Sequence, residues 1–273
     1  MKAPGLDLVK GSMSRMRQAE WSPDQYLKFE DERTRAANDL LSAVPNQNVK
    51  FAVDLGCGPG NSTELIVKRY PHAEVLGIDS SADMTAKAKE RLPGCEFAVA
   101  DIGVWQPQRN ADLLYANAVM QWLPDHDRLF PRLMGFLNRE GSLAIQMPDN
   151  LQEATHVAMR EVAADARWAA RVTQADATRS EIGTASFYHQ LLRPHCQHVD
   201  IWRTTYHHPL QGLDGVIEWF KGSGLRPYLS LLNHDERTDF LDRYKQRLAQ
   251  FYKPMDDGMV LLPFPRMFIV ATR

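Results

Sequence analysis

Apolar runs and amphipathic segments alternate along the first half of the chain. The segment 24–43 has apolar residues at helical spacing and ends before Pro45, which predicts an amphipathic helix. Beyond it, short apolar runs predict five strands, at 51–53, 74–78, 96–100, 111–116 and 141–147. Strands that alternate with helices form parallel sheets with right-handed crossovers. The first half therefore predicts an α/β fold.

The second half combines long helical stretches with two further apolar runs. Helical patterns cover residues 151–195 and 213–251, the latter with a break at 222–224. Strands are expected at 197–207 and at about 260–271. The stretch 213–251 is too long for a simple connection between two strands. We expect it to form a lid over a cleft; packing against a face of the sheet is the alternative.

The chain is expected to form one domain. Residues 21–273 make up this domain, with the N-terminal helix over the cleft and helical insertions at about 151–195 and 213–251. Residues 1–20 are expected to be a leader or a disordered segment, because their start lacks any periodicity. The apolar run at 6–9 is too short for a secretory signal.

The most informative motif follows the first predicted strand and reads Asp54-Leu55-Gly56-Cys57-Gly58-Pro59-Gly60. Glycines let the backbone turn sharply and approach a ligand closely, and ligands of open α/β sheets bind at this edge. A dinucleotide site needs Gly or Ala at the sixth position from Gly56, where this chain has Asn61. A carboxylate here would also repel a pyrophosphate on the following helix. Asp54 instead favours a cation, such as the sulfonium and ammonium of S-adenosylmethionine (SAM); the alternative is an ordinary tight turn.

Polar residues also end the next three predicted strands. Asp79 follows the second strand at the distance from the glycines at which an acid meets ribose hydroxyls. Its alternative role is to cap a helix that begins near Ser80. Asp101 follows the third strand, where it can accept the adenine amino group while the N–H of Ile102 meets the ring. With Asn117 after the fourth strand, this pattern indicates a nucleoside site.

Several segments carry a resemblance to known enzymes. The cofactor motifs of class I SAM-dependent methyltransferases are similar to segments 54–63, 77–81 and 100–102. A narrower likeness, to the trans-aconitate 2-methyltransferase family, is carried by segments 115–118, 121–126, 146–150, 200–206, 224–227 and 264–271. It runs from about Trp21 to the C-terminus. The narrower set is the more specific, because it covers the variable, substrate-facing half.

The resemblance implies a fold, a cofactor and a set of residues that bind it. The fold is the Rossmann-like class I methyltransferase fold, a seven-stranded, mostly parallel sheet with helices on both faces and a helical lid. The cofactor is SAM, with S-adenosylhomocysteine as product. In the helix over the cleft, Tyr26 and Arg33 would lie near the methionine end of SAM, where Arg33 could pair with the carboxylate; the alternative is core packing for Tyr26 and a surface charge for Arg33. The implied cofactor-binding residues are Tyr26, Arg33, Asp54, Gly56, Cys57, Gly58, Gly60, Asn61, Asp79, Ser80, Met84, Asp101, Ile102, Asn117, Ala118 and Trp122.

The implied reaction is methyl transfer to a carboxylate of trans-aconitate, giving a monomethyl ester. Such a carboxylate is already ionised at neutral pH, since its ordinary pKa is ~4, so no catalytic general base is required. The rest of the trianion cannot be buried unpaired, and arginines suit it as bidentate donors. The implied substrate-binding residues are Gln121, Trp122, Met147, Arg203, Tyr206, Trp219, Arg226, Tyr228 and Arg266. The alternatives are surface ion pairs for the arginines and core packing for Trp122.

Composition and charge limit the kinds of partner that we expect for this protein. A formal net charge of −2 gives no reason to expect nucleic acid or an anionic membrane. No apolar stretch approaches the roughly 20 residues of a membrane span. The three cysteines and the paired histidines show neither metal nor disulfide spacing, so we expect no metal and a cytoplasmic location. The resemblance implies a small polycarboxylate as partner, and the protein is expected to be a monomer or a weak homodimer.

Other functions remain open at this point. A methyltransferase could act on another small or carrier-bound acid, although no basic patch for a carrier protein is visible. An NAD-dependent oxidoreductase is disfavoured by Asp54 and Asn61. A nucleic-acid base methyltransferase is disfavoured because residues 117–120 lack the Asn/Asp-Pro-Pro-aromatic run of such enzymes. A SAM-binding module without turnover would bind the cofactor and methylate no acid.

Overall fold

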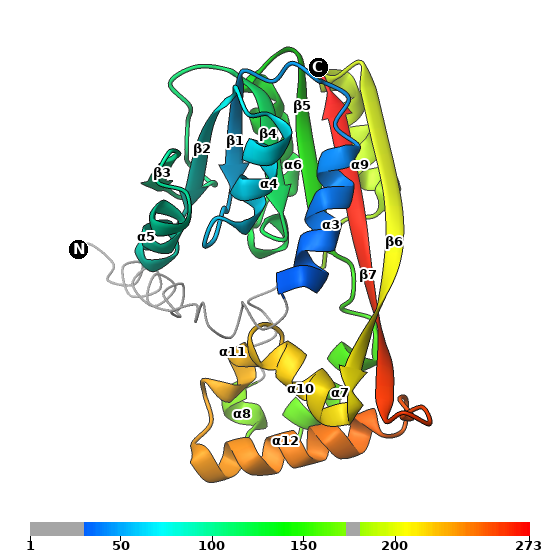
Figure 1. Cartoon of the computed structure of the whole chain (residues 1–273). Coiled ribbons are helices and arrows are strands. Elements are labelled where there is room, and N and C mark those ends of the chain that lie inside the picture. The colour runs from blue at the N-terminus through cyan, green and yellow to red at the C-terminus, as the bar shows by residue number, and fades with distance from the viewer. Residues whose placement is uncertain (1–29, 173–180) are drawn as a thin grey trace, which may run out of the picture.

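A seven-stranded sheet forms the centre of the molecule, in the order β3-β2-β1-β4-β5-β7-β6. The computed structural model describes residues 30–172 and 181–273, with side chains from residue 34 onward (Figure 1). Tyr26, the side chain of Arg33 and the segment 1–20 therefore lie outside the described residues. The strands are β1 (Phe51–Leu55), β2 (Glu74–Asp79), β3 (Glu96–Val99), β4 (Ala111–Asn117), β5 (Leu137–Pro148), β6 (His198–Gln211) and β7 (Met259–Thr272).

The sheet is mostly parallel, as predicted. Strands β1 to β5 run parallel to one another, and β7 pairs antiparallel with both β5 and β6. All seven predicted strands are confirmed, but β5 and β6 are longer than expected. The added part of β5 contains the exposed polar residues Asn138 to Glu140, and the outer half of β6 alternates buried and exposed residues as far as Gln211. Both extensions depend on pairing with distant segments and carry no continuous apolar run.

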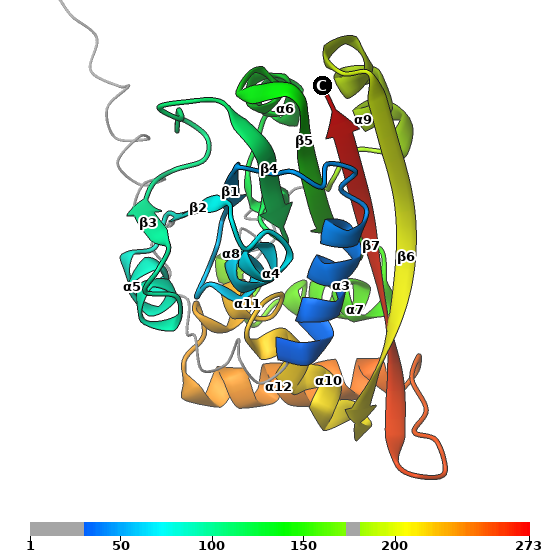
Figure 2. The ribbon, with the colours of Figure 1, turned by 45° about the horizontal axis from the view of Figure 1, so that its top comes forward.

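Helices cover both faces of the sheet. α3 (Glu30–Ser42) contacts β5 and β7, and α4 (Asn61–Arg69) contacts β1 and β2 (Figure 2). α6 (His126–Gly135) packs against β5 and α9 (Ala185–Leu192) against β6. α5 (Ala82–Arg91) lies beside β2 and β3. Two short 3₁₀ turns, η1 (Met120–Trp122) and η3 (Arg193–His195), flank this arrangement.

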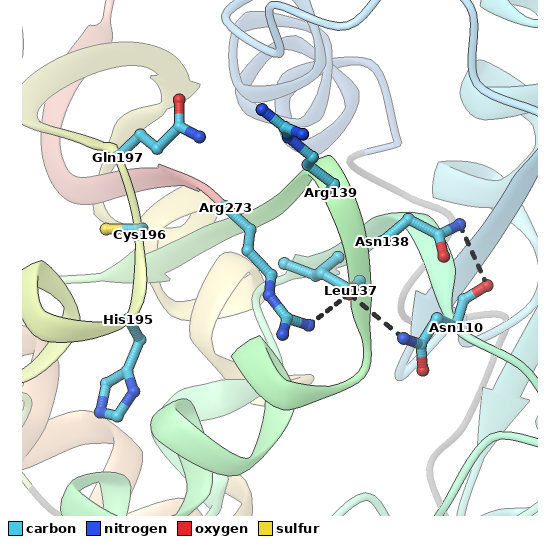
Figure 3. A pocket seen from close by; sticks show the side chains of 8 residues that line it. All are labelled: Asn110, Leu137, Asn138, Arg139, His195, Cys196, Gln197 and Arg273. Atoms are coloured by element: carbon cyan, nitrogen blue, oxygen red, sulfur yellow. Dashed lines mark hydrogen bonds between the residues drawn. The ribbon is translucent and has the colours of Figure 1, made fainter.

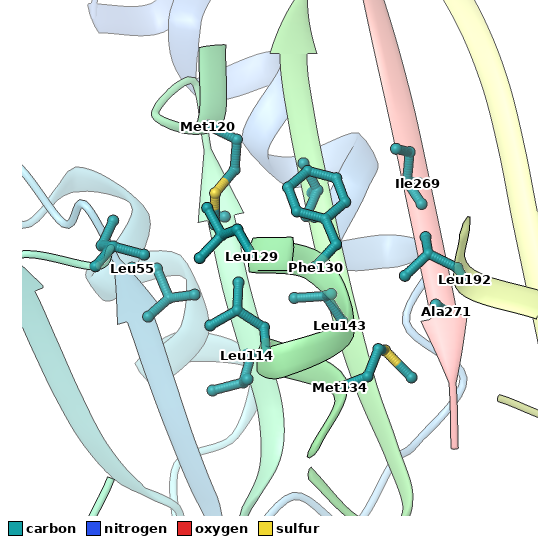
Figure 4. Packing of buried hydrophobic residues seen from close by; sticks show 14 of the residues in the cluster. Leu55, Leu114, Met120, Leu129, Phe130, Met134, Leu143, Leu192, Ile269 and Ala271 are labelled. Carbon is teal, nitrogen blue, oxygen red and sulfur yellow. The ribbon is translucent and has the colours of Figure 1, made fainter. Parts of the chain in front are cut away.

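An apolar core lies on each face of the sheet. Val53, Leu55 and Leu114 point into the core beneath α6 and α9, where Phe130 and Leu192 are fully buried (Figure 4). Successive side chains of a strand point to opposite faces. The intervening strand residues therefore face α3 and α4, and they pack there with Ala36, Leu40 and Ile66. Asp54, Asn117 and Gln146 fall on this second face at the carboxyl ends of β1, β4 and β5.

A separate layer of helices lies beyond the carboxyl ends of the parallel strands (Figure 1). It consists of α7 (Ala154–Ala163), α8 (Ala169–Val172), α10 (Gly212–Lys221), α11 (Arg226–Leu229) and α12 (His234–Leu248). These helices share a core of their own, which includes the buried Trp219, Phe240 and Tyr244. The extended β6–β7 ribbon joins the layer to the sheet, since its outer half contributes Leu210 and Leu262 to the same core.

Within the predicted helical insertions, the described residues form α7, α8 and α9 at 151–195 and α10, α11 and α12 at 213–251. The break predicted at 222–224 separates α10 from α11. The last helix of the first insertion, α9, packs on the sheet, whereas α7 and α8 join the helical layer. That this layer acts as a lid stays a prediction. None of the described helices combines the length and the apolar character that crossing a membrane requires.

Candidate active site

The glycine turn after β1 has the backbone shape that only glycine adopts readily. Gly56, Gly58 and Gly60 have φ angles of +73°, +54° and +94°. The N–H groups of Gly56 and Cys57 donate to the carbonyl of Ile78 on β2, at 2.8 and 3.0 Å, and this ties the turn to the neighbouring strand. A Cβ on Gly56 would meet Cγ2 of Val119 at 2.4 Å. The turn is therefore fixed in place and closely packed on one side.

Asp54 lies beneath this turn and is fully buried. One carboxylate oxygen, Oδ2, accepts hydrogen bonds from the hydroxyls of Ser62 and Thr63 at 2.7 Å each, which fixes the start of α4. The other oxygen, Oδ1, is buried and has no hydrogen-bond partner among residues 30–172 and 181–273. Burial raises the pKa of Asp54 from 3.8 to about 6, against the effect of the two hydroxyls. A cation bound at the turn would satisfy Oδ1 and stabilise the ionised form.

Asp79 ends β2 and faces the same turn. Its Oδ2 accepts from the N–H of Gly58 at 3.0 Å and its Oδ1 from the N–H of Ser81 at 2.9 Å. Burial raises its pKa, and these backbone bonds oppose the rise. The helix cap itself is supplied by the Ser81 hydroxyl, which accepts from the N–H of Met84 at 3.3 Å. Asp79 therefore links the glycine turn to the start of α5, and its bond to ribose stays a prediction.

The end of the third strand is more open. Asp101 is exposed, and its Oδ1 accepts from the N–H of Gly103 at 2.8 Å. Ile102 next to it is buried in the core beneath α6. Ser80 is exposed at the end of β2. These residues border the same edge of the sheet as Asp79, since β3 pairs with β2 up to Val99.

The end of β4 turns sharply into η1. Ala118 has a φ of +55°, and its N–H donates to the carbonyl of Gln146 on β5 at 2.9 Å. Gln121 is buried and donates through Nε2 to the carbonyl of Ala118 at 2.7 Å. Its Oε1 and the Oδ1 of Asn117 have no hydrogen-bond partner in the part of the chain that the structure describes. Trp122 is half-buried beside them. This corner thus places unsatisfied acceptors next to the glycine turn.

A small hollow lies between the glycine turn, α3, α4 and the end of β4. Two of its lining residues, Thr34 and Ala37, come from α3, and the others come from the glycine turn, from α4 and from the end of β4. This places α3 beside the glycine turn, and its role as a helix over the cofactor cleft stays a prediction. The full lining is Thr34, Ala37, Gly56, Cys57, Gly58, Pro59, Asn61, Ser62, Leu65 and Asn117.

Of the three predicted substrate arginines, Arg266 lies closest to this corner of the sheet. It is 3% exposed, on β7 opposite Pro148, and its Nη1 donates to Oε1 of Gln146 at 3.1 Å. Its guanidinium carbon lies 4.7 Å from the ring centre of Phe264 and 5.9 Å from that of Tyr206. Cation–π contacts of this kind hold a guanidinium in place. Arg266 is thus a fixed, buried cation near the carboxyl ends of β4 and β5.

The other two predicted substrate arginines lie on β6 and at the start of α11. The side chain of Arg203 is 51% exposed and makes an ion pair with Asp149, with Nε and Oδ2 2.7 Å apart. This is the surface ion pair that the sequence left open as its alternative. Arg226 begins α11 in the helical layer. The structure thus ties Arg203 to Asp149 at the surface, and the substrate role of Arg203 and Arg226 stays a prediction.

The remaining predicted substrate residues are packed or bonded within the protein. The Tyr206 hydroxyl donates to Oδ2 of Asp39 on α3 at 2.6 Å. Trp219 stacks on His208 with ring centres 4.5 Å apart, and Tyr228 stacks on Phe240 at 5.9 Å. Met147 is buried in the core on the opposite face of the sheet from Asp54. These contacts are those of structural residues, and ligand contacts for them stay predictions.

Sequence reasoning did not single out Gln146, although the residue opens one of the segments that carried the resemblance. A polar residue in an otherwise apolar strand was the available signal. Ser62 and Thr63, which hold Asp54, were missed for a similar reason. Their hydroxyls matter only because α4 begins directly beneath the carboxylate.

A larger hollow of about 480 Å³ lies at the opposite edge of the sheet (Figure 3). It is formed at the starts of β5 and β6, with Arg139, His195 and Arg273 among its side chains. It contains none of the predicted site residues. The chemistry therefore places the candidate active site at the smaller hollow. Among residues 30–172 and 181–273, no group of three or more His, Cys, Asp or Glu residues is arranged to hold a metal ion.

Comparison with known proteins identifies the family of the chain. Residues 52–141 match the family described as "Methyltransferase domain". A trans-aconitate 2-methyltransferase of Methylobacterium nodulans is 53% identical, with 93% of this chain and 99% of the relative covered. One from Agrobacterium fabrum is 50% identical over the same shares of the two chains.

A solved structure shows the same fold at low identity. The YcgJ protein of Bacillus subtilis superimposes with a TM-score of 0.57 at 10% identity, covering 88% of this chain and 98% of its own. The fold is that of a class I methyltransferase, as the strand order indicates. With half of all residues identical to those of curated relatives along nearly the whole length, the chain belongs to the trans-aconitate 2-methyltransferase family, whose members use SAM as methyl donor.

Proposed function

We propose that this enzyme transfers the methyl group of SAM to a carboxylate of trans-aconitate, giving a monomethyl ester and S-adenosylhomocysteine. The substrate is the one printed in the names of relatives about half identical to this chain. The single observation in the structure that supports the reaction most is Asp54, a fully buried carboxylate with one oxygen left without a partner beside the glycine turn.

The residues at the turn fit a cationic cofactor. Bound SAM supplies an electrophilic methyl group on a sulfonium. Asp54 would hold the nearby ammonium, and the backbone of Gly56 and Gly58 leaves room for close approach. Asp79, already fixed by Gly58 and Ser81, would accept from the ribose hydroxyls. The protein thus orients the cofactor through groups that are in place before it binds.

The protein's task toward the acid is positioning. In-line transfer requires the attacking oxygen to lie roughly 3 Å from the methyl carbon, opposite the sulfur. A carboxylate needs no proton removed, so none of the residues has to act as a base. Arg266, buried near the ends of β4 and β5, is the cation suited to hold one of the other carboxylates. A closed site then strengthens this charge pairing by excluding water.

The test is a panel of acids with the purified full-length chain. Release of S-adenosylhomocysteine is followed with trans-aconitate, cis-aconitate, citrate and isocitrate. We expect turnover with trans-aconitate to exceed that with the others. Turnover with another acid alone would make this a methyltransferase of that acid. Cofactor binding without turnover on any acid would favour a SAM-binding module.

A further inference from the structure

Among the buried polar atoms that have no hydrogen-bond partner in the described residues, four lie at or just after the carboxyl ends of β1, β4 and β5. Three of them, on the side of β1 and β4, are acceptors, namely Oδ1 of Asp54, Oδ1 of Asn117 and Oε1 of Gln121. The fourth, Nε2 of Gln146 on β5, is a donor. Buried polar groups are nearly always hydrogen-bonded, so each of these atoms calls for a partner that the described residues do not supply.

The orientation of the Gln146 amide is set by its neighbour. Arg266 carries only donors, and its Nη1 lies 3.1 Å from the amide oxygen of Gln146. The oxygen must therefore face Arg266, and the NH₂ group must face away from it. Gln146 is fully buried, so this NH₂ group has no access to bulk water in the structure.

The position of Gln146 directs that donor toward the active site. Gln146 on β5 is the register partner of Asn117 on β4, and Asn117 lines the hollow at the glycine turn. The two side chains lie on the same face of the sheet, the face covered by α3. Arg266 projects from β7 on this face as well, held between two aromatic rings. An amide donor and a guanidinium thus lie together next to the cofactor end of β4.

We infer that Gln146 is a substrate-binding residue whose Nε2 donates to a carboxylate of the polycarboxylate held by Arg266. The inference rests on the proposed function and extends it, because it assigns a side of the site to each ligand. The acceptors of β1 and β4 take the cationic end of SAM, and the donors of β5 and β7 take the anionic acid. The shared edge between Asn117 and Gln146 is where the two ligands meet.

Replacing Gln146 with Glu separates this role from a purely structural one. Glu keeps an acceptor for Arg266 but removes the donor and adds a negative charge. The affinity for trans-aconitate is measured by calorimetry with S-adenosylhomocysteine bound, together with KM and kcat. We expect Gln146→Glu to weaken binding of the acid roughly 30-fold or more, the loss typical of a hydrogen bond to a charged group. The affinity for SAM should change less than about threefold.

Two further variants make the result decisive. Gln146→Met, of similar size, lacks both donor and acceptor and should also weaken binding of the acid. Gln197→Glu adds the same charge at an exposed position at the far edge of the sheet and should leave all constants unchanged. If Gln146→Glu binds the acid as the wild type does while Gln146→Met does not, Gln146 only holds Arg266 and the inference is overturned. Turnover of trans-aconitate by the wild type tests the proposed function. The inference is tested separately, by the ratio of the affinities of variant and wild type for trans-aconitate.

Discussion

Asp54 is the residue on which the proposed cofactor site depends most. Its burial raises its pKa to about 6 in the ligand-free protein, so the folded state binds this proton more tightly than the unfolded state does. Ionisation of Asp54 therefore destabilises the ligand-free fold as the pH rises from about 4 through 6. A bound sulfonium and ammonium reverse this effect, because they favour the ionised carboxylate.

Stabilisation by SAM should accordingly depend on pH. We expect SAM to raise Tm more at pH 7.5 than at pH 5, and the Kd for SAM to increase as the pH falls below about 6. Thermal melts and calorimetry across this range provide the measurement. In Asp54→Asn the pH dependence should disappear and SAM should bind at least about tenfold more weakly. A pH-independent affinity in the wild type would remove Asp54 from the site.

Asp79 gives a second prediction for a single residue. Asp79→Ala should weaken SAM binding by about 1.5–3 kcal/mol, because a charged acceptor for the ribose hydroxyls is lost and Gly58 loses its hydrogen bond. Calorimetric titration with SAM measures the change. Asp83→Ala, which removes an exposed charge from the first turn of α5, is the matched control and should bind normally. Equal affinities in the two variants would contradict the assignment of Asp79.

At the scale of elements, the strand-to-helix turn after β1 was predictable from the sequence, because the turn needs residues with positive φ angles and its own glycines supply them. The lengths of β5 and β6 were less predictable. The start of β5 pairs in parallel with β4 at Ala111, and the outer part of β6 pairs antiparallel with β7, as between Gln211 and Met259, so both depend on residues far apart in the chain. The same reason applies to the site. Asp54 was evident from its place before the glycines, whereas Gln146 gains significance only from Arg266, 120 positions away in the chain.

The turn itself supports a test with a matched pair of glycines. In Gly56→Ala the new Cβ would meet Val119 at 2.4 Å in a backbone with φ of +73°, so the turn must shift. We expect a loss of about 1–3 kcal/mol in the free energy of unfolding and weaker SAM binding. Gly94→Ala has no atom within 4 Å of the new Cβ and should be nearly neutral. Chemical denaturation and SAM titration compare the two variants.

At the scale of the whole molecule, the helical layer and the sheet have separate cores joined by the β6–β7 ribbon. The layer lies beyond the carboxyl ends of the parallel strands, on the side of the candidate active site (Figure 1). The alternation of strands and helices in the first half of the sequence predicted the sheet, and the helical patterns of the second half predicted the helices of the layer. Their relative placement was not predictable in detail, since it depends on how far the ribbon extends beyond the sheet.

A lid role for the layer predicts a response to ligands. Hydrogen exchange in α10 and α11 should slow when S-adenosylhomocysteine and trans-aconitate bind together, because closure would shield these helices. Exchange in α6, which packs on the far face of the sheet, serves as the internal reference. If α10 and α11 exchange at the same rate in the free and the doubly bound protein, the layer is a structural support only.

The most direct test of the central claim is the identity of the product. The purified chain is incubated with methyl-labelled SAM and trans-aconitate, and the acid is recovered and analysed. The account predicts one label per molecule of trans-aconitate, in an ester that base hydrolyses. Label that never appears in the acid, although SAM binds at the glycine turn, would contradict the account and leave a SAM-binding protein with another substrate or none.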